Sequence, residues 1–190
     1  MLRLKREATL DDLERLPEGR RGEIVDGRIV LLPLAGCAHS RTSSFIVARL
    51  MEYEARTGWG YAFADAGAFA VELPHRRSFC PDVAFHRGPL SGPDFMKGAP
   101  IFAGEIRSKT EYGLKAERAR AAKRAEYFSA GTLVVWDIEV LREGWVRSYR
   151  AEAPHEPSVF AVGELAHAEP ALPRWTMSVE DMMNHVRGLG

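Results

Sequence analysis

The sequence has few cysteines, no long apolar run and no net charge. Cys37 and Cys80 are its only cysteines, which excludes a disulfide framework, and no four Cys and His residues stand at zinc-finger spacing. No segment approaches the roughly 18 apolar residues of a membrane-spanning helix, and residues 1–16 lack the apolar core of a secretion signal. We therefore expect a protein of the reducing cytoplasm, without a membrane span or a structural zinc site.

Charge of either sign is not in excess, because 26 Lys and Arg residues balance 26 Asp and Glu residues. No overall positive field therefore attracts nucleic acid, and only a local patch can do so. Residues 107–124 are the candidate patch, since they are rich in Lys and Arg and contain only Glu111 and Glu117 as acids. An ordinary solvated helix face has the same composition, so both interpretations stay open.

The chain has the size and the apolar content of one domain with a core. Its 190 residues are 46% hydrophobic and 27% charged, as in ordinary soluble globular proteins. No linker, internal repeat or low-complexity tract divides them. We expect a single domain over residues 1–190.

In the first half of the chain, turn residues and apolar spacing predict a hairpin and a long helix. Asp26-Gly27 supplies the positive φ angles of a tight hairpin turn, and Gly58 is a typical helix stop. The predicted elements are a short helix from Thr9, hairpin strands 22–25 and 28–32, a helix over 38–57, strands 61–64, 68–73 and 80–85 as antiparallel neighbours, and a loop or lid over 87–98.

In the second half, a strand over 100–106, a helix over 114–130 and a strand over 132–138 predict a βαβ unit with parallel strands. The sheet is therefore expected to be mixed. The predicted inner face of the helix consists of Leu114, Ala121, Ala125 and Phe128. Edge strands are predicted at 145–149 and 158–162, and a terminal helix from Ser178.

Two carboxylates in predicted strands are the strongest candidates for chemistry. Asp82 follows Pro81 and faces either solvent or a site, although an Asp after Pro is also common in turns. Glu105 lies in an apolar strand, where a buried carboxylate needs a partner. That partner is either Arg107, two residues on and on the same face, or a divalent metal ion, which prefers such hard oxygen ligands.

Three further residues are weaker candidates. Lys123 shares a helix face with Arg120 and Tyr127, and it reaches a bound phosphate if that face points to the strand ends; otherwise the face is solvated. His39 stands at the start of the long helix, either in the site or on the surface. Glu23, in a hairpin strand, either faces solvent or completes a metal shell.

Several short segments in order resemble one family. They are Glu23 to Val30 (EIVDGRIV), His39 leading a helix, Pro81-Asp82-Val83-Ala84, Glu105-Ile106-x-Ser108, Lys123-x-x-x-Tyr127 and Val135-Trp136-Asp137. In this order they resemble the Uma-type restriction-endonuclease-like family of the PD-(D/E)XK nuclease superfamily, over about residues 9–150.

The resemblance implies a restriction-endonuclease-like α/β fold, in which a central mixed β-sheet flanked by helices carries Mg²⁺ (or Mn²⁺) between Asp82 and Glu105. The superfamily's lysine two residues after the acid is replaced here by Arg107, which keeps the charge but does not readily release a proton. The resemblance assigns the lysine's role to Lys123. Lys109 is the competing candidate, and it stands where the family has proline.

The resemblance also carries Glu23 and His39 over as members of the site. The leading hypothesis is a Mg²⁺-dependent endonuclease that hydrolyses phosphodiester bonds in nucleic acid, with DNA expected, and in which Lys123 and Arg107 stabilise the transition-state charge. The alternative is a binding or assembly module of the same fold with little or no catalysis, and a third hypothesis is a hydrolase of small phosphate esters. A homodimer is expected, because the superfamily often dimerises and exposed edge strands offer a route.

Overall fold

The computed structural model describes residues 6–65 and 67–189. Within these residues the centre is a six-stranded sheet in the order β11-β10-β9-β8-β6-β3. β8 and β9 pair in parallel, and the other neighbours in this sheet are antiparallel. The strands are β3 (Tyr61–Phe63), β6 (Val83–His86), β8 (Phe102–Ile106), β9 (Val134–Glu139), β10 (Trp145–Arg150) and β11 (Ala153–Ala161). The predicted mixed α/β fold is confirmed.

Helices lie on both faces of this sheet. α2 (Cys37–Thr57) and α4 (Val179–Arg187) share an apolar core with one face, which contributes large side chains such as Phe85, Phe102 and Trp136. α3 (Leu114–Ser129) connects β8 to β9 and packs Tyr127 against small residues of the other face. Because side chains alternate along a strand, Phe102 and Ile106 point to α2, whereas Ala103, Glu105 and Arg107 point to α3.

The predicted inner face of α3 is wrong at three of its four residues, since of these four Phe128 alone packs against the core. Leu114 is 80% exposed and Ala121 and Ala125 are also exposed, while Tyr127 is fully buried. The opposite face, with Arg120 and Lys123, contacts the sheet instead. The reason is that the sheet presents carboxylates on this side, so polar partners rather than apolar area orient the helix.

The remaining elements are the short helix α1 and the strands of small sheets around the central one. They are α1 (Leu10–Glu14), β1 (Gly22–Val25), β2 (Arg28–Leu31), β4 (Phe69–Ala70), β5 (Ser78–Phe79), β7 (Met96–Lys97), β12 (Leu165–His167) and β13 (Thr176–Ser178). The predicted strand 68–73 shortens to β4, which pairs with β5 and β7 in a separate sheet, and β7 lies inside the predicted loop 87–98. β10 is not an edge strand, because β11 pairs along its outer side.

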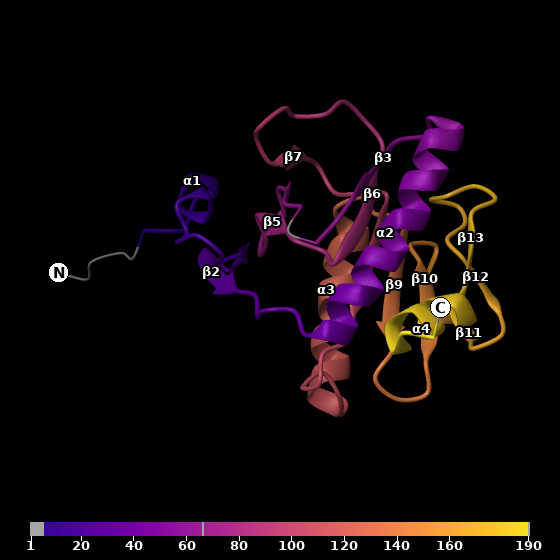
Figure 1. Ribbon diagram of the computed structural model, residues 1–190. Helices are drawn as coiled ribbons and strands as arrows, with labels where there is room; N and C mark the ends of the chain where they lie inside the picture. The colour runs from indigo at the N-terminus through magenta and orange to yellow at the C-terminus, as the bar shows by residue number, and fades with distance from the viewer. Residues whose placement is uncertain (1–5, 66, 190) are drawn as a thin grey trace.

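The N-terminal hairpin lies to one side of the body and is tied to it through β1. α1 and β2 stand apart from α2 and the central sheet, and a connecting segment leads from β2 to the start of α2 (Figure 1). Arg77 donates its backbone N–H to the carbonyl of Ile24 at 3.0 Å. This contact positions the hairpin residue Glu23 near the central sheet. Within the described residues, no helix is both long enough and apolar enough to span a membrane.

Candidate active site

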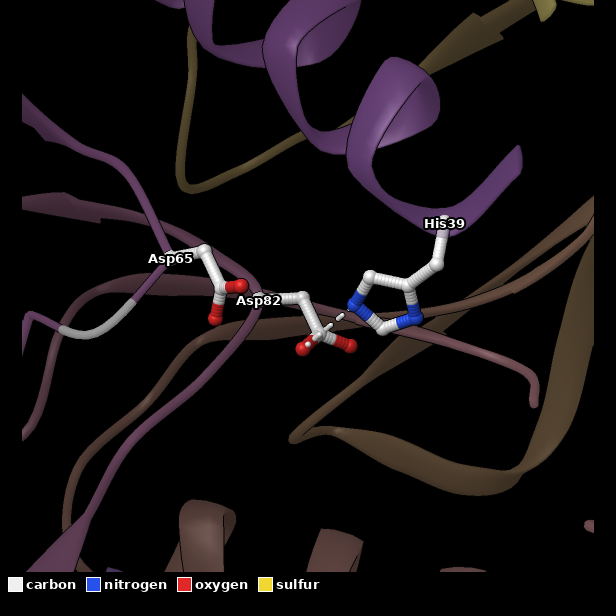
Figure 2. Close-up of side chains that lie close together, drawn as sticks. All are labelled: His39, Asp65 and Asp82. Carbon is white, nitrogen blue, oxygen red and sulfur yellow. Dashed lines mark ion pairs between the residues drawn. The ribbon is translucent and has the colours of Figure 1, made fainter. Parts of the chain in front are cut away.

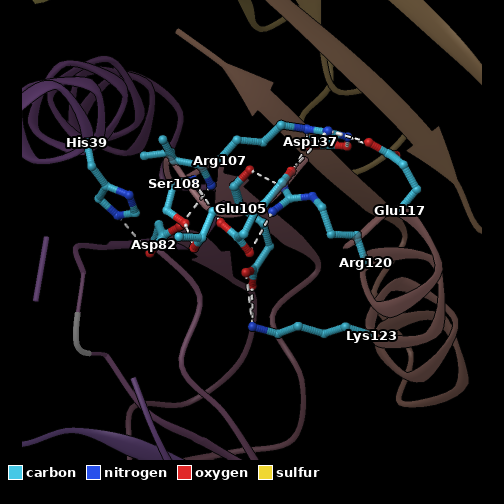
Figure 3. Close-up of polar contacts among 12 residues, drawn as sticks. His39, Asp82, Glu105, Arg107, Ser108, Glu117, Arg120, Lys123 and Asp137 are labelled. Carbon is cyan, nitrogen blue, oxygen red and sulfur yellow. Dashed lines mark hydrogen bonds and ion pairs between the residues drawn. The ribbon is translucent and has the colours of Figure 1, made fainter. Parts of the chain in front are cut away.

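A row of carboxylates crosses the sheet on the face covered by α3. β6 and β8 pair with Val83 opposite Gly104, so one residue further along Asp82 comes opposite Glu105. Between β8 and β9, Glu105 pairs with Asp137. Residues directly opposite in neighbouring strands point to the same face. Figure 3 shows Asp82 beside His39, Glu105 above Lys123, and Asp137 near Arg107 and Arg120.

Contacts with β8 and with α2 hold Asp82 in place. Its Oδ2 accepts the backbone N–H of Ile106 at 2.7 Å, which ties it to β8. Its Oδ1 lies 3.0 Å from Nε2 of His39, in the first turn of α2, and Ser43 donates to its carbonyl at 2.9 Å. The structure thus brings the predicted site residues His39 and Asp82 together.

Glu105 is held by two side chains of α3. Lys123 Nζ lies 2.9 Å from its carboxylate, and the Tyr127 hydroxyl donates to Oε1 at 2.7 Å. Burial raises the pKa of Glu105, and the charges of Asp82 and Glu23 add to this effect, while Lys123 opposes it. The negative charges around Glu105 therefore favour the binding of an additional cation beside it.

Glu23 reaches the same lysine from the N-terminal hairpin. Its Oε1 lies 3.0 Å from Lys123 Nζ and accepts the backbone N–H of Cys80 at 2.9 Å, and its Oε2 accepts from Arg76 at 2.5 Å. Burial alone would raise the pKa of Glu23, but the charges of Lys123 and Arg76 hold it below its usual value. Likewise, burial alone would lower the pKa of Lys123, but Glu105 and Glu23 raise it. Lys123 therefore stays protonated.

Arg107 faces the other end of the row. Its Nε and Nη2 donate to both oxygens of Asp137 at 2.9 and 2.6 Å, and its two Nη atoms also donate to Glu117. A weaker bond reaches the carbonyl of Glu111 at 3.4 Å. These contacts use all five N–H donors of the guanidinium. The alternative in which Arg107 is the partner of Glu105 is thus not what the structure shows, and a role on phosphate stays a prediction.

Sequence reasoning missed the ion pair between Asp137 and Arg120. Arg120 Nη2 donates to Asp137 Oδ1 at 2.6 Å and to the carbonyl of Glu105 at 2.9 Å, so it links α3 to both parallel strands. The signal was present in the helical spacing that groups Arg120 with Lys123. What was lacking was the parallel register that sets Asp137 beside Glu105.

Asp65, just beyond the end of β3, was also missed. One ligand atom each from His39, Asp65 and Asp82 lies within 4.8 Å of the others. Figure 2 shows Asp65 and Asp82 with neighbouring carboxylates and the His39 ring pointing toward Asp82. From the sequence, Asp65 resembles an ordinary turn residue after a short strand.

A cavity of about 860 Å³ opens over these groups. Its floor is the end of the sheet, and its walls are α3 and the segment from Leu32 to His39. The predicted site residues that line it are His39, Asp82, Glu105, Arg107 and Lys123, and Lys109 lines it as well. Glu23 forms an ion pair with Lys123, which lines the cavity.

A mixed sheet with a parallel β8–α3–β9 crossover, carrying an acidic row that faces the crossover helix, is a nuclease-like arrangement. A solved structure described as "a putative nuclease belonging to DUF820 from Anabaena variabilis ATCC 29413" is similar in fold, with a TM-score of 0.74 and 20% sequence identity over 94% of this chain and 99% of that chain. The family model described as "Uma2: Putative restriction endonuclease" matches residues 10–180. The chain belongs to this family, as the sequence motifs predicted. No curated protein matches it.

Proposed function

We propose that the protein is a divalent-metal-dependent nuclease that hydrolyses phosphodiester bonds in nucleic acid, with DNA as its substrate. The observation that carries the proposal is the strand register that sets Asp82 opposite Glu105, with the ammonium group of Lys123 on Glu105. Two carboxylates and a fixed cation at one end of a cavity are what metal-assisted phosphodiester hydrolysis requires.

The residues present suit Mg²⁺ or Mn²⁺ as the ion. Mg²⁺ prefers oxygen ligands and is commonly held by one or two carboxylates together with substrate phosphates. Asp82 and Glu105 are the ligands in this proposal. The raised pKa of Glu105, caused by burial and by neighbouring negative charge, indicates a group that a cation would stabilise in its ionised form.

The chain's own side chains have separable roles. When bound, the metal ion polarises the phosphate and makes the attacking water more acidic. Lys123, which stays protonated, supplies positive charge to the phosphate and does not act as a base. Tyr127 orients Glu105 through a hydrogen bond, and His39 Nε2 faces Asp82 Oδ1 at 3.0 Å. Arg107 and Arg120 hold Asp137, and α3 is fixed on the sheet by the pairs of Arg120 with Asp137 and of Arg107 with Glu117.

Cleavage of supercoiled plasmid DNA, linear DNA and RNA by the pure protein with Mg²⁺ or Mn²⁺ tests the proposal. We expect cleavage that chelation abolishes, that Glu105→Gln abolishes, and that the control Glu143→Gln retains, because Glu143 is exposed in the β9–β10 turn. Cleavage that survives Glu105→Gln or needs no divalent ion would refute the mechanism.

The alternative function is a nucleic-acid-binding or assembly module of the same fold. Two observations favour it: the saturated guanidinium of Arg107, and the pairing of Lys123 with both Glu23 and Glu105. Calorimetric titration with Mn²⁺ separates the two functions, since the module predicts no metal binding. A homodimer and a cytoplasmic location stay predictions.

A further inference from the structure

Asp65 occupies a position in the acidic row that the sequence motifs do not include. β3 and β6 are antiparallel, with Tyr61 opposite His86 and Phe63 opposite Ala84. Two residues further along the same register, Asp65 comes opposite Asp82. Because Asp82 is in turn opposite Glu105, the residues that flank β3 and β6 and the strand β8 each bring one carboxylate to the same end of the sheet.

His39 adds a nitrogen donor to this end of the row. Its Nε2 is buried and lies 3.0 Å from Asp82 Oδ1, yet it makes no hydrogen bond of good geometry within the described part of the chain. One ligand atom from each of His39, Asp65 and Asp82 falls within 4.8 Å of the others. The side chains come from α2, from the end of β3 and from the start of β6, so residues distant in sequence converge on one point (Figure 2).

The charge balance at Asp65 is unusual. Two carboxylates this close repel each other, so the pair needs neighbouring positive charge. Arg21, which directly precedes β1, forms an ion pair with Asp65. Both side chains are only partly exposed, at 21% and 26%, and Arg21 lines the cavity over the site. The N-terminal hairpin thus places a guanidinium on a carboxylate that borders the proposed metal ligands.

We infer that Asp65 is a further ligand of the divalent ion, binding it together with Asp82 and His39, and that Arg21 competes with the ion for Asp65. The inference rests on the proposed function and deepens it, because it extends the ligand set from Asp82 and Glu105 to the strand on the far side of Asp82. Carboxylate oxygens with one imidazole nitrogen are suitable donors for Mn²⁺, which serves as the probe.

Mn²⁺ binding to the full chain, measured by calorimetry without any nucleic acid, tests this inference. Asp65→Asn should weaken the affinity by about tenfold or more, since even the loss of a residue that only supports a ligand commonly costs that much. The matched control is Asp94→Asn, which removes the same charge from an exposed loop position and should leave the affinity unchanged. Thermal unfolding verifies that each variant is folded.

A second variant predicts a change of opposite sign. Arg21→Gln should tighten Mn²⁺ binding several-fold, because it releases Asp65. If the gain acts through Asp65, it disappears in the Arg21→Gln/Asp65→Asn double variant, as a double-mutant cycle would show. Arg20→Gln removes the same charge at the neighbouring exposed position and should have little effect.

The outcomes distinguish this inference from the proposed function. If Asp82→Asn abolishes Mn²⁺ binding while Asp65→Asn binds like the wild type, Asp65 is not a ligand and the proposed function stands. If Arg21→Gln tightens binding equally with and without Asp65, the competition is refuted. If the folded wild-type protein binds no Mn²⁺, both the inference and the metal-dependent function are wrong.

Discussion

Replacement of Arg107 by Met should cause a large loss of stability. Arg107 and Asp137 have side chains only 2% and 4% exposed, and two hydrogen bonds join them. Removing one partner of a buried ion pair costs about 3–5 kcal/mol, because it leaves the other charge uncompensated. Arg120 still donates to Asp137 at 2.6 Å, so we expect the lower end of this range, about 3 kcal/mol.

The loss of stability in Arg107→Met should depend on pH. Burial alone would raise the pKa of Asp137, but the bonds and charges of Arg107 and Arg120 outweigh it and hold the pKa below its usual value. A carboxylate with a lowered pKa in the folded state contributes stability above its unfolded pKa of about 3.9, and this contribution is lost as the pH falls through the folded value. The difference in the free energy of unfolding between Arg107→Met and the wild type is therefore largest at neutral pH, and it shrinks as the pH falls below about 4.

Urea unfolding followed by circular dichroism, at neutral pH and in steps below it, measures both effects. Arg118→Met is the matched control, because Arg118 is exposed on α3, where such a change stays within about 0.5 kcal/mol. A loss smaller than about 1 kcal/mol for Arg107→Met would refute the reasoning, since it would mean that Arg120 alone satisfies Asp137. A loss that stays constant as the pH falls would show that Asp137 is not the group involved.

Two other outcomes concern the thiols and the packing of β8. Native thiol labelling at pH 8 should modify the exposed Cys37 and spare Cys80 until urea is added, because burial raises the pKa of Cys80 to about 11; equal rates for both thiols would contradict this. Gly104→Ala should lower the free energy of unfolding in urea by about 1–3 kcal/mol, because an added Cβ would lie 2.4 Å from Val83 Cγ2. Gly36→Ala serves as the control, since a Cβ added at Gly36 would meet open space.

Elements with strong local signals could be predicted from the sequence. Asp26-Gly27 gave the hairpin of β1 and β2, and Asp26 has the positive φ of 47° that this turn demands. Ser178 caps α4 by accepting the N–H of Asp181, as its position before the apolar spacing indicated. The parallel pair of β8 and β9 followed from the intervening helix, because a crossover of that length favours it.

The orientation of α3 could not be predicted in the same way. Hydrophobic periodicity locates the buried face of a helix only where the opposing surface is apolar. Here the sheet presents Glu105 and Asp137, which the helix neutralises with Lys123 and Arg120. Of the predicted apolar face, Phe128 packs against the core, whereas Leu114, at 80% exposure, and the two alanines are left outside. The rule failed because the helix packs on the site and not on the main core.

The pairing of the short strands could not be predicted from the sequence, for a different reason. β4 has only two residues, and its partners β5 and β7 come from separate segments, so its pairing depends on contacts distant in the chain. The same dependence hid Asp65, because β4 and β5 stand between β3 and β6 in the sequence, so no short hairpin reveals the register of these two strands. A slip of one residue in register turns a side chain to the other face, so convergence of Asp65 and Asp82 could be seen only in the folded sheet.

Ion pairs within the site explain why residues 107–124 are rich in Lys and Arg. Its composition was compatible with a free patch or with a solvated face, but three of its basic side chains point inward, to the acidic row. Along the row each acid has its own cationic or histidine partner: Arg21 with Asp65, His39 with Asp82, Lys123 with Glu105, and Arg107 and Arg120 with Asp137. The balanced charge of the chain is thus partly internal to the site. Under the proposed function, we expect the exposed Lys109, Lys115 and Arg118 to contact the phosphate backbone outside the site, and their replacement by Gln should weaken nucleic-acid binding without unfolding the protein.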